Sequence, residues 1–148
     1  MKWWLPLAVL SLGGCSYFPQ DFDGTLGRVQ DERGFRVGLV AGSKGGPCPN
    51  FAAPYLARVA EAAQATPHAV EGAAEPLLGA LRRGELDLVL GQLDRKSPWG
   101  TEVSILEPLA ADCPGGVEYS AMARNGENRW IMLLEDAGRS LRRSGQAQ

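Results

Sequence analysis

The sequence predicts an α/β protein with a three-layer, open, mostly parallel sheet that has helices on both faces. Helical and strand patterns alternate along the chain, and a short run at Leu86–Leu90 is almost wholly apolar. A strand of this kind is typical of a parallel sheet that two helical layers cover. The 148 residues suffice for one such domain, and no internal repeat divides them.

The first half of the predicted domain alternates helix and strand. Asp23 is expected to cap a short helix that Gly34 ends, and Phe35–Ala41 then forms the first strand. Phe51–Gln64 has apolar residues at helical spacing, and His68–Gly72 is short enough to be an edge strand. Residues 42–50 between them form a loop rich in glycine and proline.

A helix followed at once by a strand defines the centre of the sheet. Ala74–Arg83 places three leucines on one helical face, and Gly84 supplies the left-handed residue that ends a helix. Leu86–Leu90 then enters the sheet. Because Asp87 interrupts the apolar run at its start, we expect its carboxylate to anchor the turn through hydrogen bonds rather than to contact a ligand.

The rest of the chain contains a loop, a connector and three regular elements. In order they are the polar loop Gln92–Glu102, a strand at Val103–Leu106, the connector Pro108–Gly116, a strand at Val117–Ala123, and a helix from Gly126 to Arg143. The last helix has one apolar face and finishes with arginines, which complement the helix dipole.

The segment Leu81–Gly91 carries the pattern Leu-x-x-Gly-x-x-Asp-Leu-Val-x-Gly, which resembles the first lobe of bacterial extracellular solute-binding proteins of the polar amino acid type. Gly24–Leu26 and Gly34–Gly38 are similar to the opening of that family. Val103–Leu109 is similar to its strand that ends in Ser-x-Pro-Tyr, although Glu107 and Leu109 depart from that ending.

This resemblance implies a single lobe of a periplasmic-binding-protein-like fold over residues 23–144. The expected strand order is second, first, third, with the late strands beyond the third and one of them antiparallel. Most of a second lobe is missing from the chain, and a single lobe leaves half of a ligand in water.

The N-terminus predicts a lipoprotein. A positive start is followed by an apolar run, Trp3–Leu12, that is too short to span a bilayer, and Leu12–Cys15 has the Leu-small-small-Cys spacing of a lipoprotein signal. Residues 1–14 are then a signal peptide, Cys15 is acylated and contacts the lipid bilayer, and residues 15–22 form a tether. The alternatives are an ordinary cleaved leader and a retained transmembrane anchor.

The resemblance to lipoproteins also implies an address on the periplasmic side of the cell envelope. Ser16 after the acylated cysteine favours the outer membrane in the sorting rule of Gram-negative cells. In that oxidising compartment Cys48 and Cys113 are an even pair, which predicts a disulfide bond. Two separate buried thiols are the alternative.

Composition and motifs exclude several classes of function. The net charge of −2 gives no basic patch for nucleic acid. The glycine-rich loop lacks the phosphate-loop spacing, and two of its residues are prolines without an N–H. His68, the only histidine, has no triad partner in the sequence pattern and there is no Cys-x-x-Cys, so we expect neither an enzyme nor a metal or other cofactor.

A candidate ligand site lies where the first and third predicted strands end, because open parallel sheets bind ligands outside the carboxyl ends of their strands. The residues expected there are Ser43, Lys44, Gln92, Asp94, Arg95 and Trp99. The alternative is that these loop residues are merely solvated. After the glycine that matches Gly91, amino acid binders carry Thr-x-x-Arg, which grips the ligand carboxylate; that pattern is absent here, and no spacing requires Arg95 to replace it.

These observations favour a membrane-anchored binding or accessory module that works beside a membrane transporter subunit. A direct receptor for a small polar solute is a second hypothesis of the same class. The alternative from another class is a structural or protein-interaction lipoprotein of the envelope without a small-molecule ligand.

Overall fold

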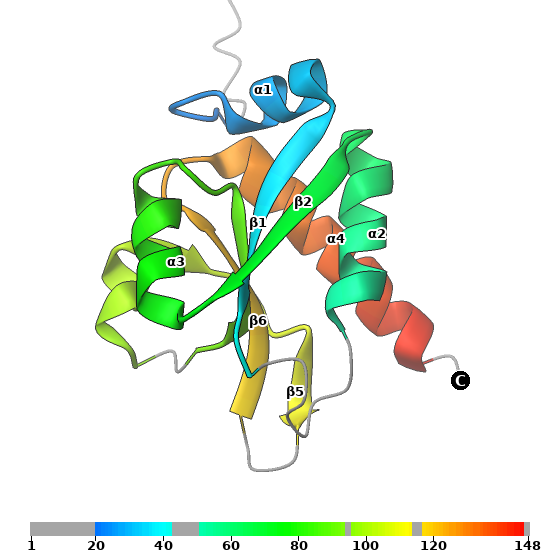
Figure 1. Cartoon of the computed structure of the whole chain (residues 1–148). Helices are drawn as coiled ribbons and strands as arrows, with labels where there is room; N and C mark the ends of the chain where they lie inside the picture. The colour runs from blue at the N-terminus through cyan, green and yellow to red at the C-terminus, as the bar shows by residue number, and fades with distance from the viewer. Residues whose placement is uncertain (1–19, 43–50, 94–95, 114–116, 147–148) are drawn as a thin grey trace, which may run out of the picture.

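A computed structural model describes residues 20–42, 51–93, 96–113 and 117–146 (Figure 1). The strands are β1 (Gly34–Val40), β2 (Thr66–Gly72), β3 (Leu88–Gln92), β4 (Val103–Ile105), β5 (Ala110–Cys113) and β6 (Val117–Arg124). The helices are α1 (Thr25–Glu32), α2 (Ala52–Ala63), α3 (Ala74–Arg82) and α4 (Asn128–Gln146), with a 3₁₀ turn, η1, at Pro98–Thr101.

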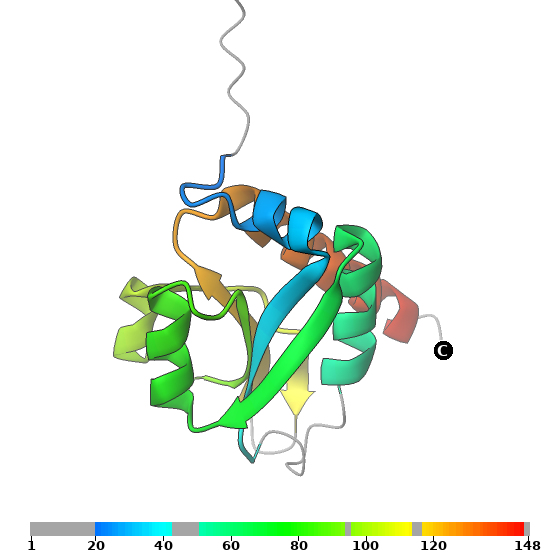
Figure 2. The same ribbon diagram turned by 45° about the horizontal axis from the view of Figure 1, so that its top comes forward.

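The strands form one sheet in the order β2-β1-β3-β6-β4, with β5 also paired to β6 (Figures 1 and 2). β1 is parallel to β2 and β3, whereas β6 is antiparallel to β3, β4 and β5. β6 therefore runs against all the other strands, which share one direction. The predicted fold class, strand order and antiparallel late strand are confirmed.

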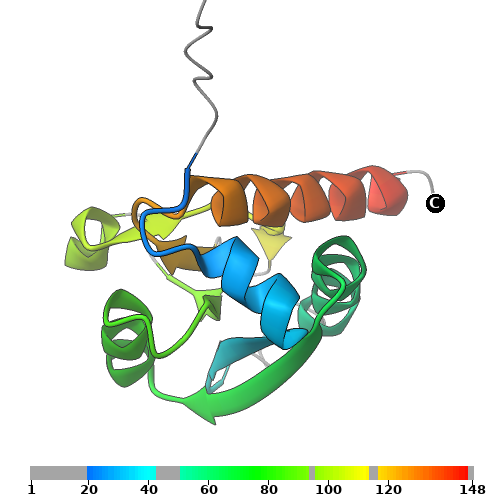
Figure 3. The ribbon, with the colours of Figure 1, turned by 90° about the horizontal axis from the view of Figure 1, so that it is seen from above.

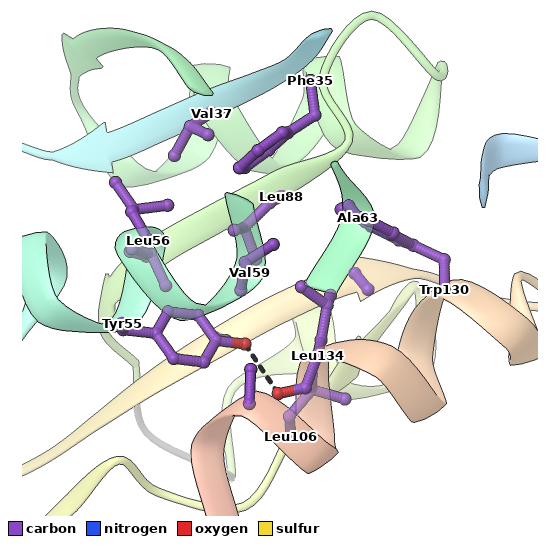
Figure 4. Close-up of a cluster of buried hydrophobic side chains, with 14 of the residues drawn as sticks. Phe35, Val37, Tyr55, Leu56, Val59, Ala63, Leu88, Leu106, Trp130 and Leu134 are labelled. Carbon is purple, nitrogen blue, oxygen red and sulfur yellow. Dashed lines mark hydrogen bonds between the residues drawn. The ribbon is translucent and has the colours of Figure 1, made fainter. Parts of the chain in front are cut away.

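Two apolar clusters, one on each face of the sheet, make the core. The larger cluster lies between the sheet and helices α1, α2 and α4, where Phe35 packs edge-on against Trp130 and the Tyr55 hydroxyl donates to the Leu134 carbonyl oxygen at 3.0 Å (Figure 4). The smaller cluster lies under α3. Leu88 and Leu90 belong to the first cluster and Val89 to the second, as the alternation of a strand requires, so the sheet is the middle of three layers.

The helix-to-strand return at the centre forms as predicted. The leucines of α3 are buried, and Gly84 adopts a φ of 75° just beyond the helix. The strand begins at Leu88 rather than Leu86, because Leu86 and Asp87 complete the turn before the ladder with β1 starts.

Two local predictions are wrong. Asp23 does not cap α1; the backbone N–H groups of Thr25 and Leu26 donate to the carboxylates of Glu127 and Asp21 instead. Asp21 lies just before the helix, but Glu127 is 102 residues from Thr25, so sequence proximity could not reveal the second carboxylate.

The connector Pro108–Gly116 contains a strand, β5, that pairs with β6. Its four residues, Ala-Ala-Asp-Cys, have neither the length nor the alternation that identifies a strand from the sequence. The strand exists because β6 extends beyond β4 and offers a free edge there.

The direction of the parallel strands gives the molecule two distinct ends. At the amino end, where β1 and β2 begin, Asp21 forms a bridge with Glu127 beside the start of α4 (Figures 1 and 3). At the carboxyl end, β1 runs into the turn at Ala41 and Gly42, and β3 ends at Gln92.

Candidate functional site

The carboxyl end of the sheet is built by the ends of three parallel strands. Ala41 follows β1, and its backbone N–H donates to the Gly72 carbonyl oxygen at the end of β2 at 2.7 Å, which joins those two strand ends. Gly42 then turns the chain with a φ of 87°, a conformation that favours glycine. This is the edge at which open parallel sheets bind ligands.

Among the described residues at this edge, Gln92 has a side-chain polar group without a hydrogen-bond partner. It is the last residue of β3 and lies opposite Tyr119 of β6. Its Nε2 atom is buried and has no hydrogen-bond partner within the described part of the chain. Since an unpartnered buried amide is costly, a ligand oxygen that accepted from Nε2 would remove that cost. A carboxylate or carbonyl group has the required chemistry.

Tyr119 beside Gln92 is a neutral neighbour. Burial raises the pKa of its hydroxyl above the ordinary value for tyrosine. The Tyr119 ring lies in the larger core cluster, so the surface beside Gln92 at the strand ends is uncharged.

Ser120 is the second residue with an unpartnered buried group, and it faces the other way. It is fully buried opposite Gly91, and its Oγ atom finds no partner among the described residues. Adjacent strand residues point to opposite faces of a sheet, so Ser120 lies on the α3 face while Tyr119 and Gln92 lie on the α2 face. Ser120 and Gln92 therefore do not form one site.

Sequence reasoning missed Ser120 and Tyr119. Both belong to an ordinary alternating strand, and their importance appears only once β6 is known to pair with β3. No local signal marks either residue.

Trp99 lies on the other side of the sheet from Gln92. It belongs to η1, its backbone N–H donates to the Ser97 Oγ at 3.4 Å, and its ring packs against the smaller core cluster with the Arg82 guanidinium 6.0 Å from the ring centre. The structure thus brings Gln92 to the strand ends and places Trp99 with α3. The remaining predicted ligand residues, Ser43, Lys44, Asp94 and Arg95, lie outside the described residues.

The predicted modification sites also lie outside the described part. These are Cys15, Cys48 and the side chain of Cys113. The lipid anchor and the disulfide bond remain predictions.

The amino end holds a cluster of buried charges that are paired with one another. Asp87 accepts from the Arg36 backbone N–H at 2.8 Å and from the Arg36 guanidinium, and it forms an ion pair with Arg28. The hydrogen bond to this carboxylate raises the pKa of Arg36. Trp130 Nε1 donates to the Asp87 carbonyl oxygen at 2.7 Å. Asp87 therefore anchors the turn, as the sequence predicts.

A reciprocal pair of caps completes this end. Glu127, fully buried before α4, accepts from the Asp23 and Thr25 backbone N–H groups at the start of α1. Asp21, before α1, accepts from the Arg129 and Trp130 backbone N–H groups at the start of α4. Each helix start is thus capped by the segment that precedes the other helix, as carboxylates at helix N-termini should be.

Within residues 20–42, 51–93, 96–113 and 117–146, no group of histidine, cysteine and carboxylate side chains could hold a metal ion. In the same ranges, no helix combines the length and the apolar character needed to cross a membrane.

No family model matches the sequence, and no curated protein matches it either. Solved structures do match in fold. A mutant of domain 1 from TmArgBP, in its arginine-bound form, superposes with a TM-score of 0.67 at 15% identity, covering 80% of this chain and 98% of that one. A mutant of ArgBP from T. maritima gives a TM-score of 0.65 at 10% identity, covering 82% and 95%.

An ancestral cationic amino acid solute-binding protein is a third structure of similar fold. It gives a TM-score of 0.58 at 11% identity, covering 82% of this chain and 95% of that chain. At such identities the likeness shows the fold alone: this chain has the fold of a single lobe of a periplasmic-binding-protein-like protein.

Proposed function

We propose that this chain is a lipid-anchored, single-lobe solute-binding module that works beside a membrane transport system on the periplasmic side of the cell envelope. The observation that carries the proposal is the match to domain 1 of an arginine-binding protein over 98% of that domain's length. One lobe accounts for the fold without a second lobe. The lipoprotein signal at Leu12–Cys15 supports the anchor, and Ser16 favours the outer membrane.

The ligand class that fits best is a small polar solute with a carboxylate, such as an amino acid. The similar structures are named for arginine and for cationic amino acids. At the carboxyl end of the sheet, the Nε2 group of Gln92, which has no partner in the described residues, is a donor for a carboxylate oxygen. Lys44 and Arg95 would add positive charge for the same group, and Asp94 would pair with a cationic side chain.

A single lobe supplies one wall of such a site. A ligand held only at the carboxyl end keeps half of its surface in water, so its affinity is low unless another protein covers it. We propose that a transport component provides this facing wall. The accessory role rests on the match to a single domain of a binding protein, whereas the ligand class rests on the strand ends.

Ligand binding is tested by thermal denaturation of the lipidated protein with a panel of amino acids, arginine first. A ligand at about 100 times its dissociation constant adds about 2.7 kcal/mol of stability. Gln92→Leu should abolish the shift, and Ser120→Ala, on the opposite face, should keep it. A flat response to the whole panel would remove the receptor function.

The accessory function is tested by capturing the tagged, lipidated protein from solubilised envelopes and identifying what copurifies. Recovery of a permease or ATPase subunit is expected. Palmitate labelling tests the anchor, and Cys15→Ser should abolish the label. If no transport component is recovered and no amino acid binds, the accessory hypothesis fails.

The second candidate is a structural or protein-interaction lipoprotein without a ligand. The specific observation in its favour is the absence of Thr-x-x-Arg after Gly91, the segment that grips the ligand carboxylate in amino acid binders. Deletion of the gene distinguishes the two functions. A structural lipoprotein gives a mechanically fragile envelope, whereas a binding module gives a transport defect.

A further inference from the structure

A groove of about 720 Å³ opens at the amino end of the molecule, between α1, α2 and the start of α4. Its apolar wall comes from Leu26, Ala62, Met132 and Leu133, and Gln20 forms part of its rim. Figure 3 views this end directly, with α1 lying between α4 and the parallel strands. The groove is thus on the side of the protein opposite to Gln92.

Exposed apolar side chains collect at the same end. The described residues include three large hydrophobic side chains that are strongly exposed, and two of them are here: Phe22 at 86% and Met132 at 50%. The Phe22 ring lies over Gly126, directly before α4, close enough that a Cβ atom there would approach the ring to 2.5 Å. The third, Val70 at 53%, is on the edge strand β2.

Arg129 adds a cation to the groove, which is also lined by Asp136, a carboxylate paired with Arg139. The Arg129 side chain is exposed, and it forms no ion pair with any residue in the described ranges. An arginine beside an apolar surface suits the boundary of a bilayer, where the guanidinium meets phosphate head groups and the apolar side chains enter the acyl region.

The distance to the predicted anchor decides what covers this surface. Gln20, on the rim of the groove, is five residues after Cys15. Even a fully extended chain of five residues spans only about 17 Å. Acyl chains on Cys15 would therefore hold Gln20, and with it the amino end of the domain, within about 17 Å of the membrane.

We infer that the surface formed by Phe22, Arg129, Met132 and Leu133 rests on the lipid bilayer. This inference deepens the proposed function and depends on the anchor at Cys15. It orients the whole domain. The seven residues of β1 rise away from that surface over about 23 Å, so the carboxyl end with Gln92 points away from the anchoring membrane. The candidate ligand edge is thereby presented to a partner.

The test uses the full-length lipidated protein in phosphatidylcholine vesicles that contain a nitroxide-labelled lipid. Phe22→Trp and Met132→Trp place a fluorophore on the proposed surface, and Val70→Trp is the matched control at an equally exposed position. In the lipidated protein, from which residues 1–14 with Trp3 and Trp4 are cleaved, the unsubstituted chain gives the background from Trp99 and Trp130. We expect the first two tryptophans to be quenched roughly threefold more than the control, as contact with lipid requires.

Equal quenching at all three positions, or stronger quenching at Val70→Trp, would overturn the orientation. The mass of the N-terminal peptide from the same preparation separates this failure from failure of the anchor. An acylated protein with equal quenching contradicts only the orientation. A protein without an acyl chain contradicts the anchor and, with it, the inference.

A second measurement needs no substitution in the protein. A lipid that carries a diazirine in its acyl chain is photolysed with the unsubstituted lipidated protein, and the labelled peptides are identified by mass spectrometry. Label on the peptides that contain Phe22 and Met132 supports the inference. Label concentrated on the β2 peptide, which contains Val70, contradicts it.

Discussion

At the amino end of the sheet, the buried carboxylates of Asp87 and Glu127 accept hydrogen bonds from several donors. At the carboxyl end, Gln92 and Ser120 each keep a buried polar atom without a partner among the described residues. Buried polar groups are normally paired, so the amino end has the chemistry of a structural joint. At the carboxyl end, the described part of the chain leaves two buried polar atoms without a hydrogen bond. Removing polar groups should therefore have opposite effects on stability at the two ends.

The largest expected effect is at Asp87. Asp87→Ala leaves the Arg36 backbone N–H and two guanidinium groups without their shared acceptor. Breaking a buried ion pair costs about 3–5 kcal/mol, and we expect about 3 because Arg28 and Arg36 are partly exposed and can hydrate. Urea denaturation measures the loss of unfolding free energy.

The control for Asp87→Ala is Glu85→Gln, which removes the exposed ion pair with Arg83 in the same turn. Exposed pairs contribute little, so its midpoint should stay near that of the parent protein. If Asp87→Ala were as stable as Glu85→Gln, the amino end would not be a structural joint.

The next effect concerns the reciprocal caps. Asp21→Ala and Glu127→Ala each remove a carboxylate that accepts backbone N–H groups at a helix start. Each loss should cost about 1–2 kcal/mol. Both carboxylates hold the same segment against α4. The double variant should therefore lose less unfolding free energy than the sum of the two single losses, with a coupling of at least about 0.5 kcal/mol. Strict additivity in urea denaturation would mean that the two caps act independently.

The amino end also illustrates what the sequence could and could not predict. Gly84 and the leucines before it predict a helix and its end, because those signals are local. Asp87 is conspicuous as the polar residue in an apolar run. Its partner Arg28 is 59 residues away, and Glu127 is 102 residues from Thr25. No periodicity connects such distant residues, so the sequence pattern points to Asp23, rather than to Glu127, as the cap of the first helix.

The location of the candidate site at the carboxyl end could be predicted from the sequence, but the side chains that line it could not. The rule that ligands bind at the ends of parallel strands needs only the strand order, and that order is implied by the family resemblance that Leu81–Gly91 carries. Which side chains reach the edge depends on register. Gln92 and Ser120 lie on different faces of the sheet because of the β3–β6 pairing. Trp99 lies on the α3 side, away from the expected site, because a 3₁₀ turn packs it on the smaller core cluster.

Tyr55 shows whether hydrogen-bond pairing or location in the molecule decides the effect of removing a polar group. It is buried near the first turn of α2, which follows the carboxyl end of β1, and yet its hydroxyl has a hydrogen-bond partner. Its hydroxyl donates to the Leu134 carbonyl oxygen at 3.0 Å (Figure 4). Tyr55→Phe should therefore cost about 1 kcal/mol at neutral pH, the net value of one hydrogen bond. A stabilised Tyr55→Phe would mean that position, rather than pairing, decides the outcome.

The same substitution has a pH signature. Burial, and then the charge of Glu135, raises the pKa of Tyr55 far above its ordinary value. Above pH of about 10 the unfolded chain releases this proton while the folded protein keeps it, so the unfolded state binds fewer protons and stability falls as pH rises. The parent protein should lose stability above that pH faster than Tyr55→Phe, and the gap between them should close. Denaturation at pH 7 and at alkaline pH checks this.

The smallest expected effect has the opposite sign and lies at the unpartnered groups. Gln92→Leu and Ser120→Ala replace a buried polar atom that has no partner in the described chain by an apolar side chain of similar or smaller size. Such replacements are nearly neutral or stabilising, so each should change the unfolding free energy by between zero and about +1 kcal/mol. Urea denaturation without ligand measures both. A loss of more than about 1 kcal/mol in Gln92→Leu would mean that Nε2 already has a partner, because only a satisfied group costs that much to remove. Buried polar groups would then be paired at both ends, and the Gln92 amide would no longer be an argument for a ligand at the carboxyl end.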